Sequence, residues 1–513
     1  MVEGRTLWEL MERRVDATPD DLMAVDEDMR TLTFAELWSE AELAAAGLRA
    51  AGVSEDDVVT WCLPNWIETF VLVAALARLG VVQNPVVPGV GEAELERLAA
   101  RSRSTLLVVP ATLDGRDVED DVTAIARRLG GVRVLVTDRA LPQGDPTTLP
   151  PLEEVDPVEP RPGWDPVRWL FHTAGGTGEP KLVRHTDASL LAAARGLIQR
   201  FGLIPQDRHA LLRPAAHVDG VVWLLASLGS GCANILTGSL DTDGVCEVLA
   251  REGVTLAGST PADHRAFVAR QRRDLQPLFP DVRAFTGGGH VPPEGLVDEV
   301  RSLFDVPVLS SYGLTEAPVV AAASPSDPDL GGVTVGTPVH GVEVRLVQPD
   351  GTIATGGEEG EIRVRAPQLM AGYEDPSLDQ DAFDDDGFLR TGDLGRFDEH
   401  GRLVVTGHVQ DIILRPAGAV SAVELERLLH QHDRVEDAAV IGLPDPDRGE
   451  QVCAVVQPRR GAGTLTAEEV LGHLRERGLS TDDLPERVEI VDVLPRTRTG
   501  AVLKQVLRDE LKG

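Results

Sequence analysis

The sequence predicts an α/β protein. We expect a large N-terminal domain of helix-covered sheets with a small β-rich subdomain, followed by a small α+β C-terminal domain. Between residues 33 and 316, short apolar runs alternate with amphipathic stretches, which is typical of parallel sheets covered by helices. Residues 333–403 instead carry short alternating strands with Gly and Asp turns, and a separate unit begins after Gly407. A chain of 513 residues is also too long for a single core.

The first elements follow from a capping box and from apolar runs of strand length. Thr33 and Glu36 have capping-box spacing, and Leu37, Leu43 and Leu48 follow with the apolar spacing of an amphipathic helix. The next runs predict strands at 58–63, 81–87 and 105–109 and helices at 67–78 and 92–100. This alternation indicates a parallel sheet with helices on its faces.

A glycine-rich stretch at 173–181 follows an apolar run, 169–171, that indicates the end of a buried strand. Its glycines allow positive φ, and successive backbone N–H groups in such a loop form a concavity for an anion. The candidate anion-binding residues are Thr173, Gly175, Gly176, Thr177, Gly178 and Lys181. The stretch is not a Walker A loop, which places Lys directly after its last Gly. Considered alone, it is also compatible with an ordinary surface turn.

Further βα units follow this stretch. The expected helices are 188–200, 221–228 and 244–252, and the expected strands are 210–212, 234–236, 256–258, 282–286 and 306–310. Two of these strands end in motifs, Gly287-Gly288-Gly289-His290 and Ser311-Tyr312-Gly313-Leu314-Thr315-Glu316. Ligands of open α/β sheets bind beyond the carboxyl ends of the strands, so the three motif loops are expected to converge on one cleft.

The C-terminal unit has its own elements. We expect a helix at 423–430, strands at 437–442 and 451–457, and a helix that begins at the capping box of Thr466 and Glu469.

The composition is that of a globular protein with a strong negative charge. The net charge is −34, from 83 acidic and 49 basic side chains. Binding to duplex nucleic acid needs clustered Lys and Arg, so no nucleic-acid partner is expected. The four cysteines lie far apart, without the spacing of a zinc site or a disulfide framework, which is typical of free thiols in a reducing compartment.

No segment is expected to enter a membrane. The most apolar run, 70–82, contains Arg78 and is too short to span a bilayer. The first five residues have no apolar segment of a signal peptide. We therefore expect a cytoplasmic protein, and the sequence leaves its oligomeric state open.

Taken together, the motifs resemble the adenylate-forming superfamily, which comprises acyl-CoA synthetases, peptide-synthetase adenylation domains and luciferases. The matching segments are the phosphate loop at 173–181, the YGxTE motif at 312–316, the GE…GY segment at 360–373, the TGD motif at 389–394, the hinge at 407–426 and the C-terminal catalytic motif at 495–504. They occur in family order across nearly the whole chain.

The resemblance implies a two-step reaction with ATP and Mg²⁺. A carboxylate attacks the α-phosphorus of ATP, giving an acyl adenylate and pyrophosphate, and a thiol then displaces AMP. That thiol belongs to coenzyme A or to the phosphopantetheine of an acyl carrier protein. Catalysis of this kind depends on positioning and on neutralising charge.

The resemblance also assigns roles to residues of this chain. The phosphate loop with Lys181 would hold the β- and γ-phosphates, and Thr315 and Glu316 would be catalytic, with Glu316 binding Mg²⁺. Four further residues would hold the nucleoside: Tyr312 would cover the adenine, Gly287 and Gly288 would allow its close approach, and Asp393 would accept hydrogen bonds from the ribose.

One histidine falls near the expected acid-binding site. His217 occupies the position where many family members place an aromatic residue or His beside the acyl carboxylate. A structural histidine after a strand is the alternative. His290 and Trp223 are weaker candidates for the same pocket.

Two positions depart from the family pattern. The C-terminal motif usually has a catalytic Lys after its Gly, but this chain has Ala501, which supplies no cation. A substitution made to trap a complex and a natural loss would both explain Ala501. In the hinge, His408 stands where Arg commonly reaches the nucleotide, and His is shorter and titrates near neutrality.

We therefore expect an N-terminal AMP-binding domain, 1–406, and a mobile C-terminal domain, 407–513. The expected enzyme is an acyl-CoA synthetase-like ligase that activates a small carboxylic acid, with adenylation impaired by Ala501. One alternative is an acyl-AMP ligase that loads a carrier protein or activates an unusual acid such as nitrite. Another is a nucleotide-binding pseudoenzyme. The sequence does not identify the acid.

Overall fold

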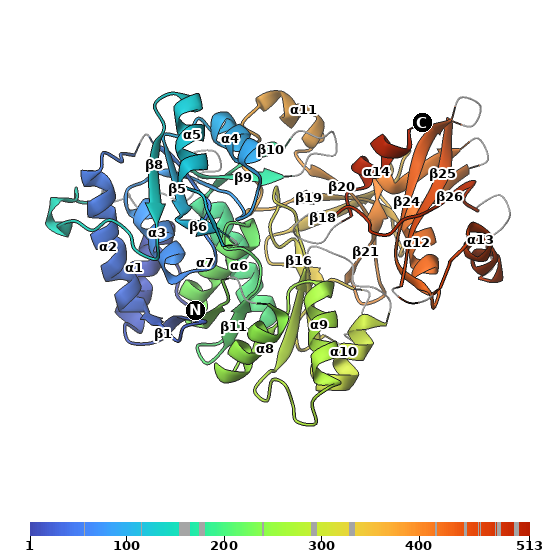
Figure 1. The fold of residues 1–513 in the computed structure, drawn as a ribbon, viewed down its shortest axis with the longest axis horizontal. Helices are drawn as coiled ribbons and strands as arrows, with labels where there is room; N and C mark the ends of the chain where they lie inside the picture. Colours follow the sequence, from blue (N-terminus) through green and yellow to red (C-terminus); the bar gives the residue numbers. More distant parts are fainter. Residues whose placement is uncertain are drawn as a thin grey trace.

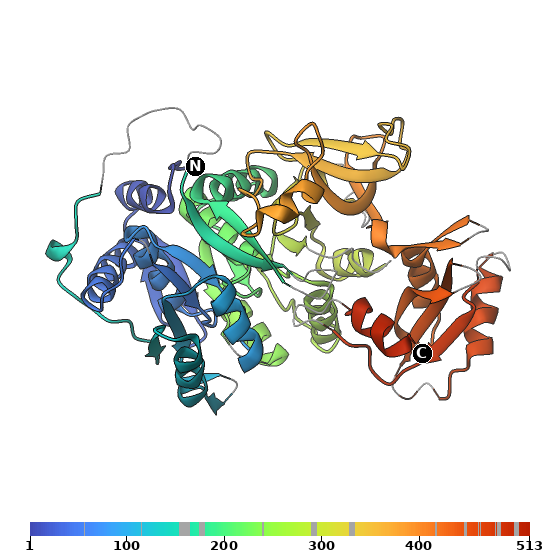
Figure 2. The ribbon, with the colours of Figure 1, turned by 90° about the horizontal axis from the view of Figure 1, so that it is seen from above.

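The structure is a computed structural model of the chain, drawn in two orientations in Figures 1 and 2. It describes residues 1–513 apart from 56, 114, 153–164, 174–179, 239–240, 289–294, 328–333, 416–417, 446–448, 460, 462, 478, 480–483, 497–501 and 513. The side chains of 410, 412, 414–415, 418–419 and 449 are also left out.

The larger of two big sheets has nine strands. In spatial order they are β17 (Thr337–Pro338), β16 (Ala321–Ala322), β15 (Val308–Tyr312), β14 (Ala284–Gly288), β13 (Leu256–Ala257), β11 (Arg208–Leu211), β12 (Ala233–Leu236), β1 (Leu22–Asp26) and β2 (Thr31–Thr33). The strands from β15 to β1 are parallel, and the strands at both edges are antiparallel.

Side chains of this sheet alternate between two cores. On β11, Ala210 packs with helices α8 (Thr242–Arg251), α9 (Pro261–Gln271) and α10 (Leu296–Phe304), whereas Leu211 faces α6 (Asp187–Phe201) and α7 (Val218–Ser230). Ile235 and Leu236 of β12 divide in the same way. Both faces are therefore covered by helices, as expected for a parallel sheet.

The second big sheet has six strands. Their spatial order is β10 (Lys181–Thr186), β9 (Val167–Thr173), β4 (Val82–Pro85), β3 (Val58–Trp61), β5 (Leu106–Pro110) and β8 (Arg133–Thr137). Helices α1 (Leu7–Ala17), α2 (Phe34–Ala50) and α3 (Ile67–Arg78) lie in the core shared by the two sheets, and α4 (Glu92–Arg101) and α5 (Glu119–Leu129) cover the outer face. Short elements β6 (Thr112–Leu113), β7 (Arg116–Asp117) and η1 (Pro146–Thr148) complete this region.

A smaller antiparallel sheet and the C-terminal elements follow. The small sheet contains β18 (Glu343–Val347), β19 (Gly360–Arg365), β20 (Leu389–Phe397) and β21 (Leu403–His408), with η2 (Pro376–Leu378) and α11 (Asp379–Ala382) beside it. The later elements are η3 (Val409–Asp411), β22 (Ile412–Arg415), β23 (Gly418–Ser421), α12 (Ala422–His430), β24 (Val435–Asp445), β25 (Gly449–Pro458), α13 (Ala467–Glu476), β26 (Arg487–Ile490) and α14 (Lys504–Leu511). Both views show α12, α13 and α14 at one end of the molecule (Figures 1 and 2).

These layers confirm the expected mixed α/β fold. The helix expected at 67–78 is α3, and the capping boxes at Thr33 and Thr466 are both formed. Helices α5, α9 and α10 and strand β8 were not expected from the sequence.

The setting of the glycine-rich loop differs from the expected one. The three motif loops follow β9, β14 and β15, but β9 lies in the six-stranded sheet and the other two strands lie in the nine-stranded sheet. After the loop, β10 returns antiparallel to β9, with Lys181 opposite Thr173. A parallel return needs a crossover of a dozen or more residues, and residues 174–180 are too few for that.

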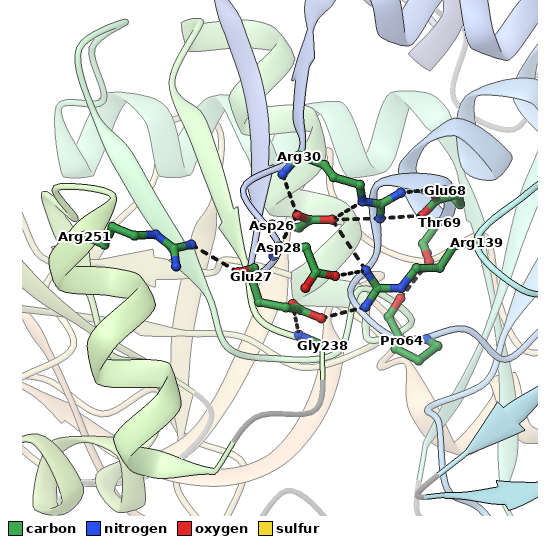
Figure 3. A network of polar contacts seen from close by, with 10 residues as sticks. All are labelled: Asp26, Glu27, Asp28, Arg30, Pro64, Glu68, Thr69, Arg139, Gly238 and Arg251. Atoms are coloured by element: carbon green, nitrogen blue, oxygen red, sulfur yellow. Dashed lines mark hydrogen bonds and ion pairs between the residues drawn. The ribbon is translucent and has the colours of Figure 1, made fainter.

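A network of charged side chains joins the two big sheets (Figure 3). Arg139, which follows β8, donates to Glu27 after β1 at 2.8 Å, and its guanidinium lies 5.3 Å from the centroid of a Trp66 ring. The other oxygen of Glu27 accepts from the Gly238 amide at 2.8 Å, beyond β12. Because Glu27 is 10% exposed at its side chain, Arg139 compensates a nearly buried charge.

We expect Arg139→Ala to destabilise the fold by about 1.5–3 kcal/mol, the range for hydrogen bonds to charged groups. The measurement is urea unfolding followed by tryptophan fluorescence. Arg128→Ala is the matched control, because Arg128 pairs with Glu92 and Glu96 while 46% exposed, and it should cost less than about 1 kcal/mol. Equal losses in the two variants would mean that the network does not join the sheets.

Candidate functional site

Two of the expected nucleotide-binding residues meet where the nine-stranded sheet approaches the small sheet. Tyr312 is the last residue of β15, Asp393 lies within β20, and both are buried. The Tyr312 hydroxyl donates to Oδ2 of Asp393. Burial and the Asp393 charge raise the pKa of Tyr312 well above its usual value, so the hydroxyl remains a donor.

Glu316 is held in the same way by a second tyrosine. The Tyr373 hydroxyl donates to Oε1 of Glu316 at 2.8 Å, and the ammonium of Lys181 lies 4.9 Å from the centroid of the Tyr373 ring. Lys181, Tyr373 and Glu316 therefore form one chain of contacts between β10 and the segment after β15. The chain has two tyrosines in all, and each hydroxyl orients one of the two expected carboxylates.

Thr315 is fixed through its backbone. Nε2 of His185 lies 2.7 Å from the Thr315 carbonyl oxygen, and since a carbonyl only accepts, Nε2 carries the proton. Burial lowers the pKa of His185 to about 4, so the imidazole is neutral at physiological pH. Neither His185 nor Tyr373 was expected to make these contacts, although Tyr373 lies in the GE…GY segment.

Gly287 and Gly288 end β14 beside Ser310 and Ser311 of β15. A Cβ at Gly287 would meet His264 Cε1 at 3.7 Å and Ser310 Oγ at 3.8 Å, which is ordinary contact distance. A Cβ at Gly288 would lie 2.9 Å from Ser311 Oγ. A side chain at 288 would therefore have to displace the Ser311 hydroxyl, whereas a Cβ at 287 would make only ordinary contacts.

Several expected site residues lie outside the described part of the chain. They are Gly175, Gly176, Thr177 and Gly178 of the phosphate loop, together with His290 and Ala501. The two ends of the phosphate loop, Thr173 and Lys181, are described and pair across the β9–β10 ladder.

His408 also reaches Asp393. Its Nδ1 contacts Oδ1 of Asp393, on the carboxylate that takes the Tyr312 hydroxyl on its other oxygen. The hydrogen bond to Asp393 raises the pKa of His408 above its usual value. The expected ribose acceptor is therefore already engaged from two sides in this structure.

His217 has a structural contact of its own. Its Nδ1 accepts from the Asp219 amide at 3.2 Å and caps helix α7. Burial lowers the pKa of His217, which favours the neutral ring. The nearby pocket is lined by Trp223 but not by His217, so the described geometry favours the structural explanation for His217.

Lys504 is the basic residue three positions after Ala501. Its ammonium pairs with Asp411 at 2.8 Å and with Glu426 at 2.9 Å, and its side chain is 19% exposed. Glu426 also accepts from the Val440 amide at 2.7 Å. Lys504 thus ties the segment after β21 to the C-terminal unit.

Two kinds of feature are absent from the described residues. No helix among them is both long and apolar enough to cross a bilayer. They contain no group of three His, Cys, Asp or Glu side chains placed to hold a metal ion by themselves.

Known proteins share the sequence pattern of this chain over most of its length. The AMP-binding enzyme family matches residues 11–374, and its C-terminal domain matches residues 424–501. The chain is 28% identical to the medium-chain fatty-acid–CoA ligase of Escherichia coli, over 99% of this chain and 90% of that protein. It is 30% identical to the salicyl-AMP ligase / salicyl-S-ArCP synthetase of Mycobacterium tuberculosis, over 99% and 91%.

The fold was also compared with solved structures. The ATP-bound form of MatB from Rhodopseudomonas palustris superposes with a TM-score of 0.86 at 26% identity, covering 98% of each chain. The apo form of the same protein gives a TM-score of 0.75 with the same coverage. The protein described here therefore belongs to the AMP-binding enzyme family.

Proposed function

We propose that this chain activates a carboxylic acid as its acyl adenylate and transfers the acyl group to a thiol. One observation carries the proposal: two tyrosines orient Asp393 and Glu316 at adjoining points of the same strand-end region. Lys181 enters this region from the phosphate-loop hairpin. Such preorganised carboxylates, hydroxyls and an ammonium suit chemistry that depends on positioning and on neutralising phosphate charge.

In this proposal each group acts on one part of ATP. Asp393 accepts from the ribose hydroxyls, Tyr312 packs against the adenine, and Gly287, which has no side chain, allows that ring to approach the backbone. Lys181 and the loop that begins at Thr173 hold the β- and γ-phosphates. Thr315, fixed by His185, and Glu316 lie beside the reacting phosphate.

Glu316 is also the proposed Mg²⁺ ligand. Mg²⁺ is commonly bound by one or two carboxylates together with substrate phosphates, which fits Glu316 acting together with the phosphates of ATP. Bound there, the ion would neutralise phosphate charge. Tyr373 holds the carboxylate of Glu316 ready for it.

The relatives support the proposed thiol acceptor and the proposed movement of the C-terminal domain. Names of relatives include both CoA ligases and a carrier-protein synthetase, so coenzyme A and a carrier protein are both proposed acceptors. The better match to ATP-bound than to apo MatB supports a C-terminal domain, 407–513, that moves against 1–406 near His408.

Calorimetric titration and pyrophosphate exchange test the proposed function. AMP and ATP should bind to the chain as it stands, because the residues proposed to hold the nucleotide lie before residue 409. Exchange that depends on an added acid should be measurable in the Ala501→Lys form. Transfer of the acyl group to only one of coenzyme A and a carrier protein would show which of the two is the acceptor. Nucleotide binding without exchange in either form would indicate a pseudoenzyme, and absent nucleotide binding would contradict the proposal.

We expect Tyr373→Phe to raise the Mg²⁺ concentration needed for half-maximal exchange by about tenfold, since groups that orient a metal ligand typically contribute 10–100-fold. The measurement is made in the Ala501→Lys form. Tyr312→Phe is the matched control, because it removes the other tyrosine hydroxyl and should weaken AMP binding instead. An unchanged Mg²⁺ requirement in Tyr373→Phe would mean that Glu316 is oriented without it.

We also expect AMP affinity to rise with pH. Protonated His408 competes with the ribose hydroxyls for Asp393. The pKa of His408 is raised by this hydrogen bond. The His408–Asp393 ion pair is therefore fully formed below about pH 6.5 and is lost as pH rises through the raised pKa of His408. Asp411 and Lys504 also face His408, with opposing effects on its charge. His408→Gln should bind AMP with little pH dependence across this range. Calorimetry from pH 6 to 9 checks this, and the same slope in both forms would refute the competition.

A further inference from the structure

A pocket lies beyond the carboxyl ends of β11, β13, β14 and β15, beside helix α7. Its floor is apolar, with Leu197, Phe201 and Trp223 among its lining, whereas Arg213 and Ser259 face it from strand-end loops and Asp219 from the first turn of α7. Gly287 and Gly288 also line the pocket, and so it adjoins the proposed adenine site. In the proposed function this pocket holds the acid, and the present inference rests on that function.

The pocket is small. Its volume is about 40 Å³, whereas an engineered cavity that binds benzene has about 150 Å³. One water-sized group needs about 10–15 Å³ on this measure, so the pocket has room for about three to four such groups. This volume matches a short acyl group better than an aromatic ring or a long acyl chain. The rings of His209 and Trp223 stack in the pocket lining with centroids 3.5 Å apart.

The polar side of the pocket is built around the Arg213 guanidinium, whose side chain is 11% exposed. Nε donates to Ser259 Oγ at 3.0 Å, Nη2 donates to the Gly288 carbonyl at 2.8 Å, and Nη1 pairs with Asp219 at 3.0 Å. A guanidinium has five N–H groups. Within the described part of the chain these contacts use three of them, which leaves two for a ligand.

The surroundings favour an acceptor as the partner of those two N–H groups. Asp219 is already paired with Arg213 and lies in the first turn of α7, where the helix dipole also offsets its charge. Burial lowers the pKa of His209 to about 3, and among the described residues its Nδ1 has no hydrogen-bond partner. A purely apolar acyl group would leave these buried polar groups without partners, which is costly.

We propose that the acid activated here is short, with about four non-hydrogen atoms beyond its carboxyl group, and that it carries a second oxygen acceptor which Arg213 binds. Arg213 is then a specificity-determining residue. The acceptor can be a carboxylate or a carbonyl oxygen, since both accept from a guanidinium.

Stable acyl-adenylate mimics, 5′-O-(N-acylsulfamoyl)adenosines, test this without any adenylation step. Three acyl groups of matched size are compared by calorimetry: carboxyacetyl, 3-oxobutanoyl and the apolar 3-methylbutanoyl. We expect at least one acceptor-bearing mimic to bind about 10-fold or more tighter than 3-methylbutanoyl. The benzoyl and octanoyl mimics should bind no more tightly than 3-methylbutanoyl. Comparing the carboxyacetyl and 3-oxobutanoyl mimics distinguishes a charged from a neutral acceptor.

Arg213→Gln should abolish the preference for an acceptor. Ser259→Ala is the matched control, because it removes a support of Arg213 but keeps the guanidinium, and it should retain the preference. The inference is overturned if the unaltered chain shows no preference, if the benzoyl or octanoyl mimic binds tightest, or if the preference persists in Arg213→Gln. The comparison within the unaltered chain stands even if Arg213→Gln fails to fold. Tight AMP binding with no acyl preference would overturn this inference alone, whereas absent AMP binding would overturn the proposed function as well.

Discussion

The Ala501→Lys variant is expected to form the acyl adenylate about 10³–10⁵ times faster than the chain as it stands, the range for one positioned cation in phosphoryl transfer. Negative charge builds around the α-phosphorus in the first half-reaction. By resemblance to the family, the missing Lys acts there and is turned away before the thiol attacks. Release of AMP from a supplied acyl adenylate by a thiol should therefore differ little between the two forms.

The two half-reactions are to be measured separately in both forms, with Ala501→Met as the control for side-chain length without charge. Ala501→Met should adenylate as slowly as the unaltered chain. If the unaltered chain already adenylates near the rate of Ala501→Lys, another cation performs this role. The role proposed for position 501 would then be wrong.

Lys504 is the obvious substitute cation, and its contacts argue against that role. Its ammonium is shared between Asp411 and Glu426, both at hydrogen-bond distance. Burial opposes its charge, but these two carboxylates outweigh burial, so the pKa of Lys504 is raised. Reaching a nucleotide would require breaking both pairs and leaving the nearly buried Glu426 carboxylate without a cation.

The parts of the fold that the sequence predicted are those with a strong local signal. Helix α3 has a continuous apolar run, and α2 and α13 begin at capping boxes with Glu at the third position. Helix α9 begins at a capping box that uses Thr260 and Asp263, and its few apolar residues give almost no amphipathic pattern. Helix α5 carries apolar residues at Val122, Ile125, Ala126 and Leu129, which is the spacing of an amphipathic helix, so its signal was present in the sequence and was missed.

The site was predictable as motifs but not as contacts. Tyr312, Glu316 and Asp393 stand out in the sequence because each belongs to a short pattern. Tyr373 acts through Glu316, which is more than fifty residues away in the chain. Arg213 acts through residues on loops from other strands, such as Ser259. No periodicity or spacing encodes such pairs, so the sequence offered His217 for the acid site while the pocket is built on Arg213.

Removing the Lys504 ammonium is expected to destabilise the C-terminal unit more than a change on the surface of that unit. Lys504→Met should cost about 3 kcal/mol, the lower end for breaking a buried ion pair, because the Lys504 side chain is partly exposed. Glu426, whose pKa burial already raises, then loses its cation beside the Val440 amide in β24. Urea unfolding monitored by hydrogen exchange of the β24 and α12 amides measures the loss.

Two variants make this last expectation specific. Lys512→Met removes an exposed pair with Asp509 and should cost less than about 0.5 kcal/mol. Adding Glu426→Gln to Lys504→Met should recover part of the loss, because the unpaired carboxylate is then neutral, and residues in contact are coupled by about 0.5–3 kcal/mol. If Lys504→Met costs no more than Lys512→Met, the triad with Asp411 does not hold the hinge segment. Lys504 would then be free to act as the cation that position 501 lacks.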